Sequence, residues 1–198
     1  PGTLSEPDLA VAGPLARAAE DLALALEVLA GAHGESAKGW QLQLPAARHA
    51  ELKQYRVACW FDNTACPVSQ DTQHALQAVA QALCDAGADV DQNPGLPVNA
   101  AESFELYDRL LNAIIGAGLP EKLYNGLRRL APLLNLLPFT AKGKLASFAA
   151  RATSSHRDWA RANEKRERER AAWATFFEQY DVLLMPVNIT PAFPHDHS

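Results

Sequence analysis

The sequence predicts an α/β protein that is rich in helix and contains one βαβ unit. Apolar residues recur every three to four positions along several segments, which is the period of an amphipathic helix. Two short runs of β-forming residues, 56–61 and 88–91, flank one of these segments. A third run, 181–186, follows a long helical segment. The runs 56–61 and 88–91, with the helical segment between them, have the spacing of a βαβ unit. We therefore expect these two strands to be parallel.

Composition excludes several classes of protein. The chain has 198 residues, 48% of them hydrophobic, and its formal net charge is -5. This negative balance argues against nucleic-acid and anionic-membrane partners, because both reward clustered positive charge. No apolar run approaches the roughly 18–20 residues of a membrane span. The three cysteines form no CxxC pair, and their odd number favours a reducing compartment, so we expect a cytoplasmic location.

The first predicted helix begins at Pro14 and ends at Gly31. Proline suits the first helical position because its missing N–H would have no partner there, and glycine suits the left-handed residue after a helix. The spacing of the apolar residues predicts one buried face. This face consists of Leu15, Ala18, Ala19, Leu22, Leu26 and Leu29.

The βαβ unit is predicted over 56–92. Its first strand ends at the turn residues Asp62 and Asn63, and the helix that follows is capped by Ser69 or Asp71. A glycine, Gly87, ends that helix before the second strand. The predicted apolar stripe of the helix is Ala75, Leu76, Val79, Ala80 and Leu83.

Residues 99–153 are predicted to form a helical region. Its first helix, 99–117, carries apolar residues on nearly every side: Phe104, Leu106, Tyr107, Leu110, Leu111, Ile114 and Ile115. The next stretch, 121–152, is rich in Leu and Ala but is interrupted three times. The interrupting residues are Pro132, Pro138 and Gly143. We therefore expect short helices that pack as a cap or a channel wall.

A long helix is predicted over 154–180. Trp159, Trp173 and Tyr180 belong to one line of residues seven apart, so the ends of the helix should be aromatic and buried. At the four-residue spacing, ion pairs are expected between Glu164 and Arg168 and between Lys165 and Glu169.

The middle of this helix leaves two interpretations open. Arg166 and Glu169 face the same side, in a run of alternating charges. This side is either a solvated, ion-paired face or the place where a buried Arg166 holds another segment through its planar guanidinium.

No part of the sequence predicts a self-sufficient active site. Ser154, Ser155 and His156 are adjacent, so on a helix their side chains point about 100° apart, and helix capping suits the serines better. The pair Gly143 and Lys144 lacks the other residues of a phosphate-binding loop. The two histidines of 195–197 have no further cluster of metal-ligating residues to complete a site, so we expect no metal site. We likewise expect no catalytic residue in this chain.

Several segments, in a fixed order, resemble one enzyme family. They are 13–17 with the leucine-rich residues 21–31, then 56–90, and finally 157–187 with the proline-containing residues 191–196. In this order they resemble the amidase signature family of serine hydrolases. The resemblance touches nearly all 198 residues.

The resemblance implies a helix-rich fragment of a mixed β-sheet fold, with residues 1–198 as a single partial domain. The parts of this domain are a core helix (1–31), the βαβ unit (56–92), a helical substrate-side region (99–153) and the long helix with its strand (154–186). The family uses a serine nucleophile, a second serine preceded by a cis peptide bond, and a lysine base. None of these has a counterpart here, so we expect an internal segment that lacks the catalytic loop and the last part of the sheet.

The activity implied by the resemblance is hydrolysis of a carboxamide C–N bond in a small molecule, without a metal or organic cofactor. This segment would give scaffold and substrate-pocket wall and would be inactive alone. The residues that the resemblance suggests for this wall are Phe104, Tyr107, Leu111, Asn188, Ile189 and Thr190. Core packing explains the three apolar ones equally well, whereas Asn188 is a polar residue just past a strand end, where α/β ligand sites form.

Two alternatives remain beside the amidase segment. The chain could be a non-catalytic binding or assembly module, in which exposed sheet edges and apolar helix faces lead to self-association. It could also be one component of a split hydrolase, with the nucleophile on another polypeptide.

Overall fold

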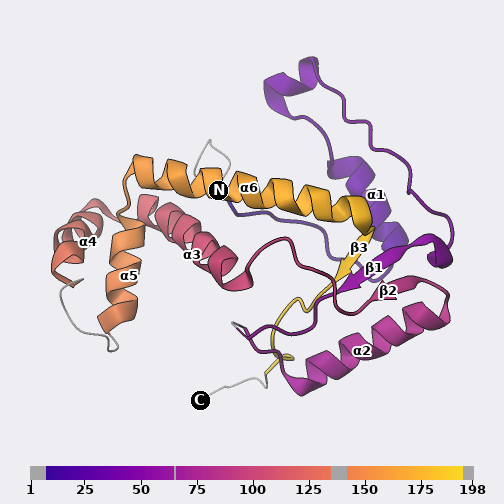
Figure 1. The fold of residues 1–198 in the computed structure, drawn as a ribbon. Coiled ribbons are helices and arrows are strands. Elements are labelled where there is room, and N and C mark those ends of the chain that lie inside the picture. The colour runs from indigo at the N-terminus through magenta and orange to yellow at the C-terminus, as the bar shows by residue number, and fades with distance from the viewer. Residues whose placement is uncertain (1–7, 65, 135–141, 194–198) are drawn as a thin grey trace. The chain divides into compact units, whose positions relative to one another are not determined.

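A computed structural model describes residues 8–64, 66–134 and 142–193, and it divides the chain into two compact units (Figure 1). The first unit comprises residues 1–48 and the second comprises residues 49–198. Each unit is described by itself.

The first unit contains the helix α1, Ala19–Leu29, and a short 3₁₀ helix, Gly34–Lys38. The predicted start at Pro14 is wrong: the helix begins five residues later, after Ala18, whose side chain cannot cap it. The predicted buried face is also wrong, because no residue of α1 is buried and Leu29 is 68% exposed. Within this unit, the described residues offer α1 no second long element against which its leucines could pack.

The second unit is built around a parallel three-stranded sheet, which confirms the α/β fold class. Its strands are β1 (Arg56–Cys59), β2 (Asp89–Asp91) and β3 (Val182–Leu184), in the order β2-β1-β3. The central strand is the most buried, and its residues Val57, Ala58 and Cys59 are 2%, 0% and 3% exposed. The predicted parallel pairing of β1 with β2 is confirmed. The described strands are all parallel, so this part of the sheet is not mixed.

The helix α2, Gln70–Asp85, connects β1 to β2 and lies beside the strands (Figure 1). Of the two predicted caps, Ser69 is the one that serves: its side chain accepts a hydrogen bond from the N–H of Thr72. The helix ends as predicted at Gly87, whose φ of 91° favours glycine and which bonds back to Cys84. Its buried stripe is narrower than predicted, because Ala80 is buried but Val79 is 46% exposed.

Four helices complete the unit: α3 (Ala100–Ala117), α4 (Glu121–Leu134), α5 (Lys142–Ala152) and α6 (His156–Gln179). Asn99 caps α3, and its side chain accepts hydrogen bonds from two backbone N–H groups of the first turn. Figure 1 shows α3 alongside α6, and the contact is made by Leu106 and Leu110 with Ala162 and the half-buried Trp159. The apolar side chains of α3 are therefore not all packed, and Phe104 is 67% exposed.

The breaks predicted for residues 121–152 are partly wrong. Pro132 lies inside α4, in its last turn, so it costs this helix one N–H donor without ending it before Leu134. Gly143 lies inside α5, and Pro138 is outside the described residues. Two short helices do form here as expected, and they pack through Leu127, Ala131 and Ala149.

The long helix α6 forms as predicted, with Ser155 as its cap. Its aromatic C-terminal end packs inward, with Phe176 6% exposed and its ring centroid 4.7 Å from that of Tyr180. The expected pair of Arg168 with Glu164 is present at 3.3 Å. Glu169 instead accepts a hydrogen bond from the hydroxyl of Ser103 on α3, at 2.9 Å.

The exposure of the Arg166 side chain lies between the two interpretations, because the side chain is neither fully buried nor fully solvated. The side chain is 25% exposed, and it contacts Asn163 and Glu167 on its own helix. Glu169, on the same helix, accepts a hydrogen bond from the hydroxyl of Ser103 on α3.

Candidate functional site

The candidate site is a pocket of about 260 Å³ beyond the carboxyl ends of β1 and β3. Two segments far apart in the sequence line it, one after each strand. They contribute Trp60, Asp62, Asn63, Cys66, Val68, Met185, Pro186, Val187, Asn188 and Ile189. Neighbouring parallel strands end at the same edge of a sheet, so the two segments meet there.

Backbone hydrogen bonds tie the two walls of the pocket together. The N–H of Trp60 donates to the carbonyl of Leu184 at 2.9 Å and so continues the pairing of β1 with β3 by one residue. At the other end, the N–H of Ser69 donates to the carbonyl of Ile189 at 2.8 Å. The pocket is therefore held at both ends by the main chain.

Side-chain hydrogen bonds shape the segment after β1. The carboxylate of Asp62 accepts a hydrogen bond from the N–H of Val68 at 3.0 Å, which closes the loop between them. The indole N–H of Trp60 donates to the backbone carbonyl of Asp62 at 3.1 Å. On the opposite wall, Asn188 Oδ1 accepts from the N–H of Ile189 at 2.9 Å, which orients the exposed carboxamide.

The opposite, amino-terminal end of the same strands is fixed by one buried carboxylate. Asp181 is 3% exposed in its side chain and accepts hydrogen bonds from the N–H and the guanidinium of Arg56, at 2.9, 3.2 and 3.3 Å. Its own N–H donates to the carbonyl of Arg56 at 2.9 Å. His49 Nε2 lies 3.5 Å from Asp181 Oδ1. These contacts set the register of β3 on β1.

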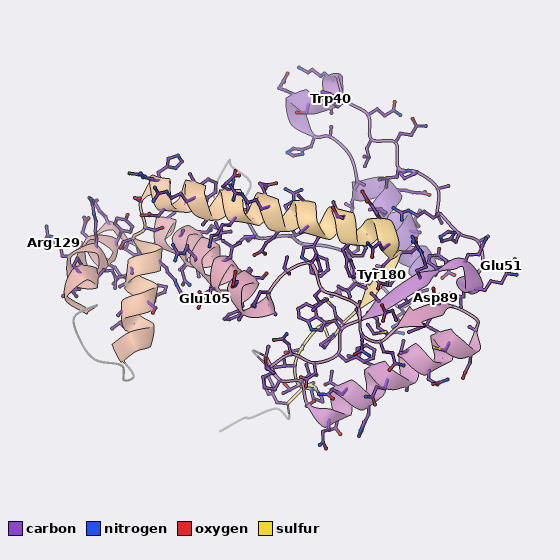
Figure 2. The ribbon with its side chains drawn as sticks, viewed as in Figure 1. Trp40, Glu51, Asp89, Glu105, Arg129 and Tyr180 are labelled. Carbon is purple, nitrogen blue, oxygen red and sulfur yellow. The ribbon has the colours of Figure 1, made fainter. Side chains whose placement is uncertain are left out.

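Tyr180, just before β3, is hydrogen-bonded to the far strand. Its hydroxyl donates to Asp91 Oδ2 at 2.5 Å, across the sheet from β3 to β2. Figure 2 labels Tyr180 and Asp89 close to the sheet. The hydrogen bond from Tyr180 lowers the pKa of Asp91, and the same bond raises the pKa of Tyr180. The edge strand β2 is thus linked to the end of α6 as well as to β1.

The structure brings together some of the residues predicted for the substrate wall. Asn188 and Ile189 line the pocket, whereas Thr190 is exposed and outside its lining. Phe104, Tyr107 and Leu111 lie on α3 and do not line it either. The role of all six residues in substrate binding stays a prediction.

The sequence does not predict the wall contributed by the segment after β1. Its pattern indicates only a turn at Asp62 and Asn63, and no role at the site for Trp60 or Cys66. Their signal was their place just after a buried strand, the same signal that favoured Asn188. This signal alone does not predict the wall, because nothing in the local sequence pattern tells that β1 lies beside β3.

Two further properties bear on the class of the site. The described part of the chain contains no group of three or more His, Cys, Asp or Glu residues that could hold a metal ion. Residues 195–197, with their two histidines, are outside the described residues. Among the described helices, none is both long enough and apolar enough to cross a membrane.

Comparison with known proteins tests the resemblance drawn from the ordered segments. A family model described as Amidase matches residues 3–198. No curated protein matches the chain, and no solved structure does. The family match supports an amidase-like hydrolase acting on C–N bonds. Since it spans nearly the entire sequence, the chain belongs to the amidase family.

Proposed function

We propose that the chain supplies scaffold and part of the substrate-pocket wall of an enzyme that hydrolyses a carboxamide C–N bond. The family match over residues 3–198 supports the class of reaction. The observation that carries the binding role is the pocket beyond the ends of β1 and β3. Ligands of α/β proteins bind in crevices outside the carboxyl ends of the strands, and this is such a crevice.

The lining of the pocket suits one end of a small amide. A carboxamide needs both a hydrogen-bond donor and an acceptor, and the side chain of Asn188 carries both. Trp60 and Met185 offer apolar surface to the rest of the molecule. A volume of about 260 Å³ is slightly below the ~300–1,000 Å³ of sites for drug-sized ligands, so the pocket fits an acyl or amine group of modest size.

Binding of a simple amide tests this role. In an NMR titration with benzamide, we expect amide signals of Trp60 and Asn188 to shift. The variant Asn188→Ala should weaken this binding about tenfold, the equivalent of one good hydrogen bond to the ligand. Asn93→Ala is the matched control, because Asn93 is an exposed asparagine after β2 that does not line the pocket. Equal weakening of benzamide binding by both variants, or an unchanged amide signal of Trp60, would refute the proposed role of these residues in the pocket wall.

The chemistry is proposed to need a serine nucleophile, a second serine and a lysine base that lie outside these 198 residues. The chain alone should then release no ammonia from aliphatic or aromatic amides. Ammonia release above background that survives repurification would contradict this part of the proposal, while the binding test would still judge the pocket. If the nucleophile belongs to a second polypeptide, activity should arise only when the two are mixed.

An assembly role is the second candidate, and it rests on the edges of the sheet. Within the described residues, β2 and β3 each pair with β1 alone, so each leaves one side without a strand. Unpaired strand edges promote association with another chain. Sedimentation velocity over a range of concentrations tests this candidate. A sedimentation coefficient that rises with concentration supports it, and a constant monomeric value rejects it.

A further inference from the structure

A second and larger cavity lies among the four helices of the second unit. It has a volume of about 870 Å³ and is lined by residues of α3, α4 and α5 and by the start of α6. The pocket described above lies beyond β3, after the other end of α6. The 24 residues of this helix span about 36 Å, so the cavity is a separate site. It is called the helical cleft below.

Positive charge dominates the lining of the helical cleft. Three of the helices contribute one guanidinium each, with Arg109 on α3, Arg128 on α4 and Arg151 on α5. Among the lining residues that the structure describes, Asp158 alone carries a carboxylate. Arginines from three separate helices line this one cleft. This arrangement differs from the alternating positive and negative charges on the exposed side of α6.

The acidic groups near the cleft are already engaged. Asp108 forms an ion pair with Arg151. Asp158 Oδ2 accepts a hydrogen bond from the hydroxyl of Ser155 at 2.6 Å, within the cap of α6. Arg128, in contrast, is exposed and makes no side-chain hydrogen bond or ion pair with any residue that the structure describes. Its guanidinium is available to a ligand.

The rest of the lining indicates a ligand with an apolar part. Tyr124, Ala131, Pro132 and Ala150 offer apolar surface beside the arginines, and Ser147 adds a hydroxyl. The planar guanidinium matches the oxygens of a carboxylate or a phosphate with two parallel hydrogen bonds. The volume lies within the usual range for sites of small organic ligands.

From this geometry we infer that the helical cleft binds a small organic oxyanion, a carboxylate or a phosphate ester that carries an apolar or aromatic group. Arg128 is its main anchor, and Arg109 contributes from the opposite helix. The inference does not depend on the proposed hydrolase function, because its site, ligand charge and measurement are all different.

NMR titration of the whole chain with three probes tests the inference. The probes are phenyl phosphate, benzoate and the neutral benzyl alcohol. We expect at least one of the two anions to shift the amide signals of α4, α5 and the first turn of α6, and benzyl alcohol to leave them unchanged. Phenyl phosphate and benzoate are compared so that the stronger binder identifies the oxyanion.

Two neighbouring arginines provide a matched pair of variants. Arg128→Gln should weaken binding of the anion about tenfold, as expected for the loss of a charge-assisted contact. Arg129→Gln removes the same charge from the next position of α4 but is outside the lining, and it should leave the affinity within about twofold. Figure 2 shows Arg129 on the side of α4 that faces away from α5. Helix content by circular dichroism is compared first, and Arg109→Gln replaces Arg128→Gln if the latter has lost helix.

Three outcomes would overturn the inference. The first is that neither anion shifts the signals of the cleft at millimolar concentration. The second is equal weakening by Arg128→Gln and Arg129→Gln, which would indicate only nonspecific attraction to positive charge. The third is that the shifts gather on the basic side of α6, at Arg157, Arg161 and Lys165, and not in the helical cleft.

Discussion

The two ends of α6 belong to regions that are held together in different ways. At its carboxyl end, the sheet is fastened by hydrogen bonds between side chains and main chain that lie far apart in the sequence. At its amino end, α3, α4 and α5 are fastened by small residues that let the helices approach closely. The first region therefore depends mainly on charge and hydrogen bonding, and the second depends mainly on the volume of its side chains.

The sheet region has a small apolar core, and polar contacts hold its strands in register. Val57, Cys59, Ala80 and Ala88 form this core. Asp181 joins β3 to Arg56, which is 125 positions away in the sequence, and Tyr180 joins the same segment to β2. Losing one of these contacts should loosen the edges of the sheet and leave its central strand buried.

The helical region also has polar contacts, such as the ion pair of Asp108 on α3 with Arg151 on α5, but its closest contacts are made by small residues. Its buried side chains are mostly alanines, and Ala149 and Ala152 are 0% and 3% exposed. Gly116 on α3 lies so close to α5 that a Cβ atom at this position would overlap the carbonyl group of Ala152. Contacts of this kind tolerate no added atom.

Gly116→Ala is expected to have the largest effect, because the added methyl group would meet main-chain atoms that cannot rotate away. We expect the free energy of unfolding to fall by about 3 kcal/mol, the upper part of the range for overpacked cores. Urea unfolding followed by circular dichroism measures it. Gly126→Ala in α4 is the control: its Cβ would meet nothing within 4 Å, so alanine should raise stability by about 0.5–1 kcal/mol. A neutral Gly116→Ala would show that the helices are not packed this closely.

The sheet region is tested by Asp181→Ala. This change leaves the N–H of Arg56 without its acceptor, and the guanidinium keeps only its hydrogen bond to the carbonyl of Glu178, so we expect a loss of about 2 kcal/mol. The value is lower than for a fully buried ion pair because the Arg56 side chain is 43% exposed and can turn to water. Asp89→Ala, at an exposed position on β2, should change stability by less than about 0.5 kcal/mol. Similar losses in both variants would mean that Asp181 acts only through net charge.

The same contrast explains what could be predicted from the sequence. The βαβ unit was predicted correctly because its signals are local: a short β-forming run, the cap Ser69, the glycine Gly87 and a second run. The pairing of β1 with β3 has no local signal, since 125 positions separate the residues that fasten them. For this reason only one wall of the pocket, with Asn188 and Ile189, was among the predicted site residues.

The helical region shows a second limit. An apolar pattern tells that a helix is buried somewhere but not which neighbour covers which side. Phe104 and Tyr107 fit the pattern of α3, yet they are 67% and 48% exposed, because α6 covers the side with Leu106 and Leu110. The close approach at Gly116 cannot be predicted either, since a glycine required by a neighbouring backbone looks the same in sequence as one that ends a helix.

The smallest expected effect is a pH-dependent one, and it belongs to the sheet region alone. Tyr180→Phe keeps the ring against Phe176 but removes the hydroxyl that donates to Asp91. The hydrogen bond lowers the pKa of Asp91 in the folded state, so its stabilising contribution is present above the unfolded pKa of this carboxyl and is lost as the pH falls through the folded one. It likewise raises the pKa of Tyr180, so the contribution is also lost as the pH rises through that value.

Urea unfolding of the native chain and of Tyr180→Phe over a range of pH should therefore give a stability difference that is greatest near neutral pH and shrinks on both sides. Tyr107→Phe, on the exposed side of α3, is the control, because it removes a tyrosine hydroxyl and leaves the hydrogen bond to Asp91 intact. A constant difference for Tyr180→Phe would assign the role of Tyr180 to ring packing. The contrast between a charge-dependent sheet region and a volume-dependent helical region would then rest on Asp181 alone.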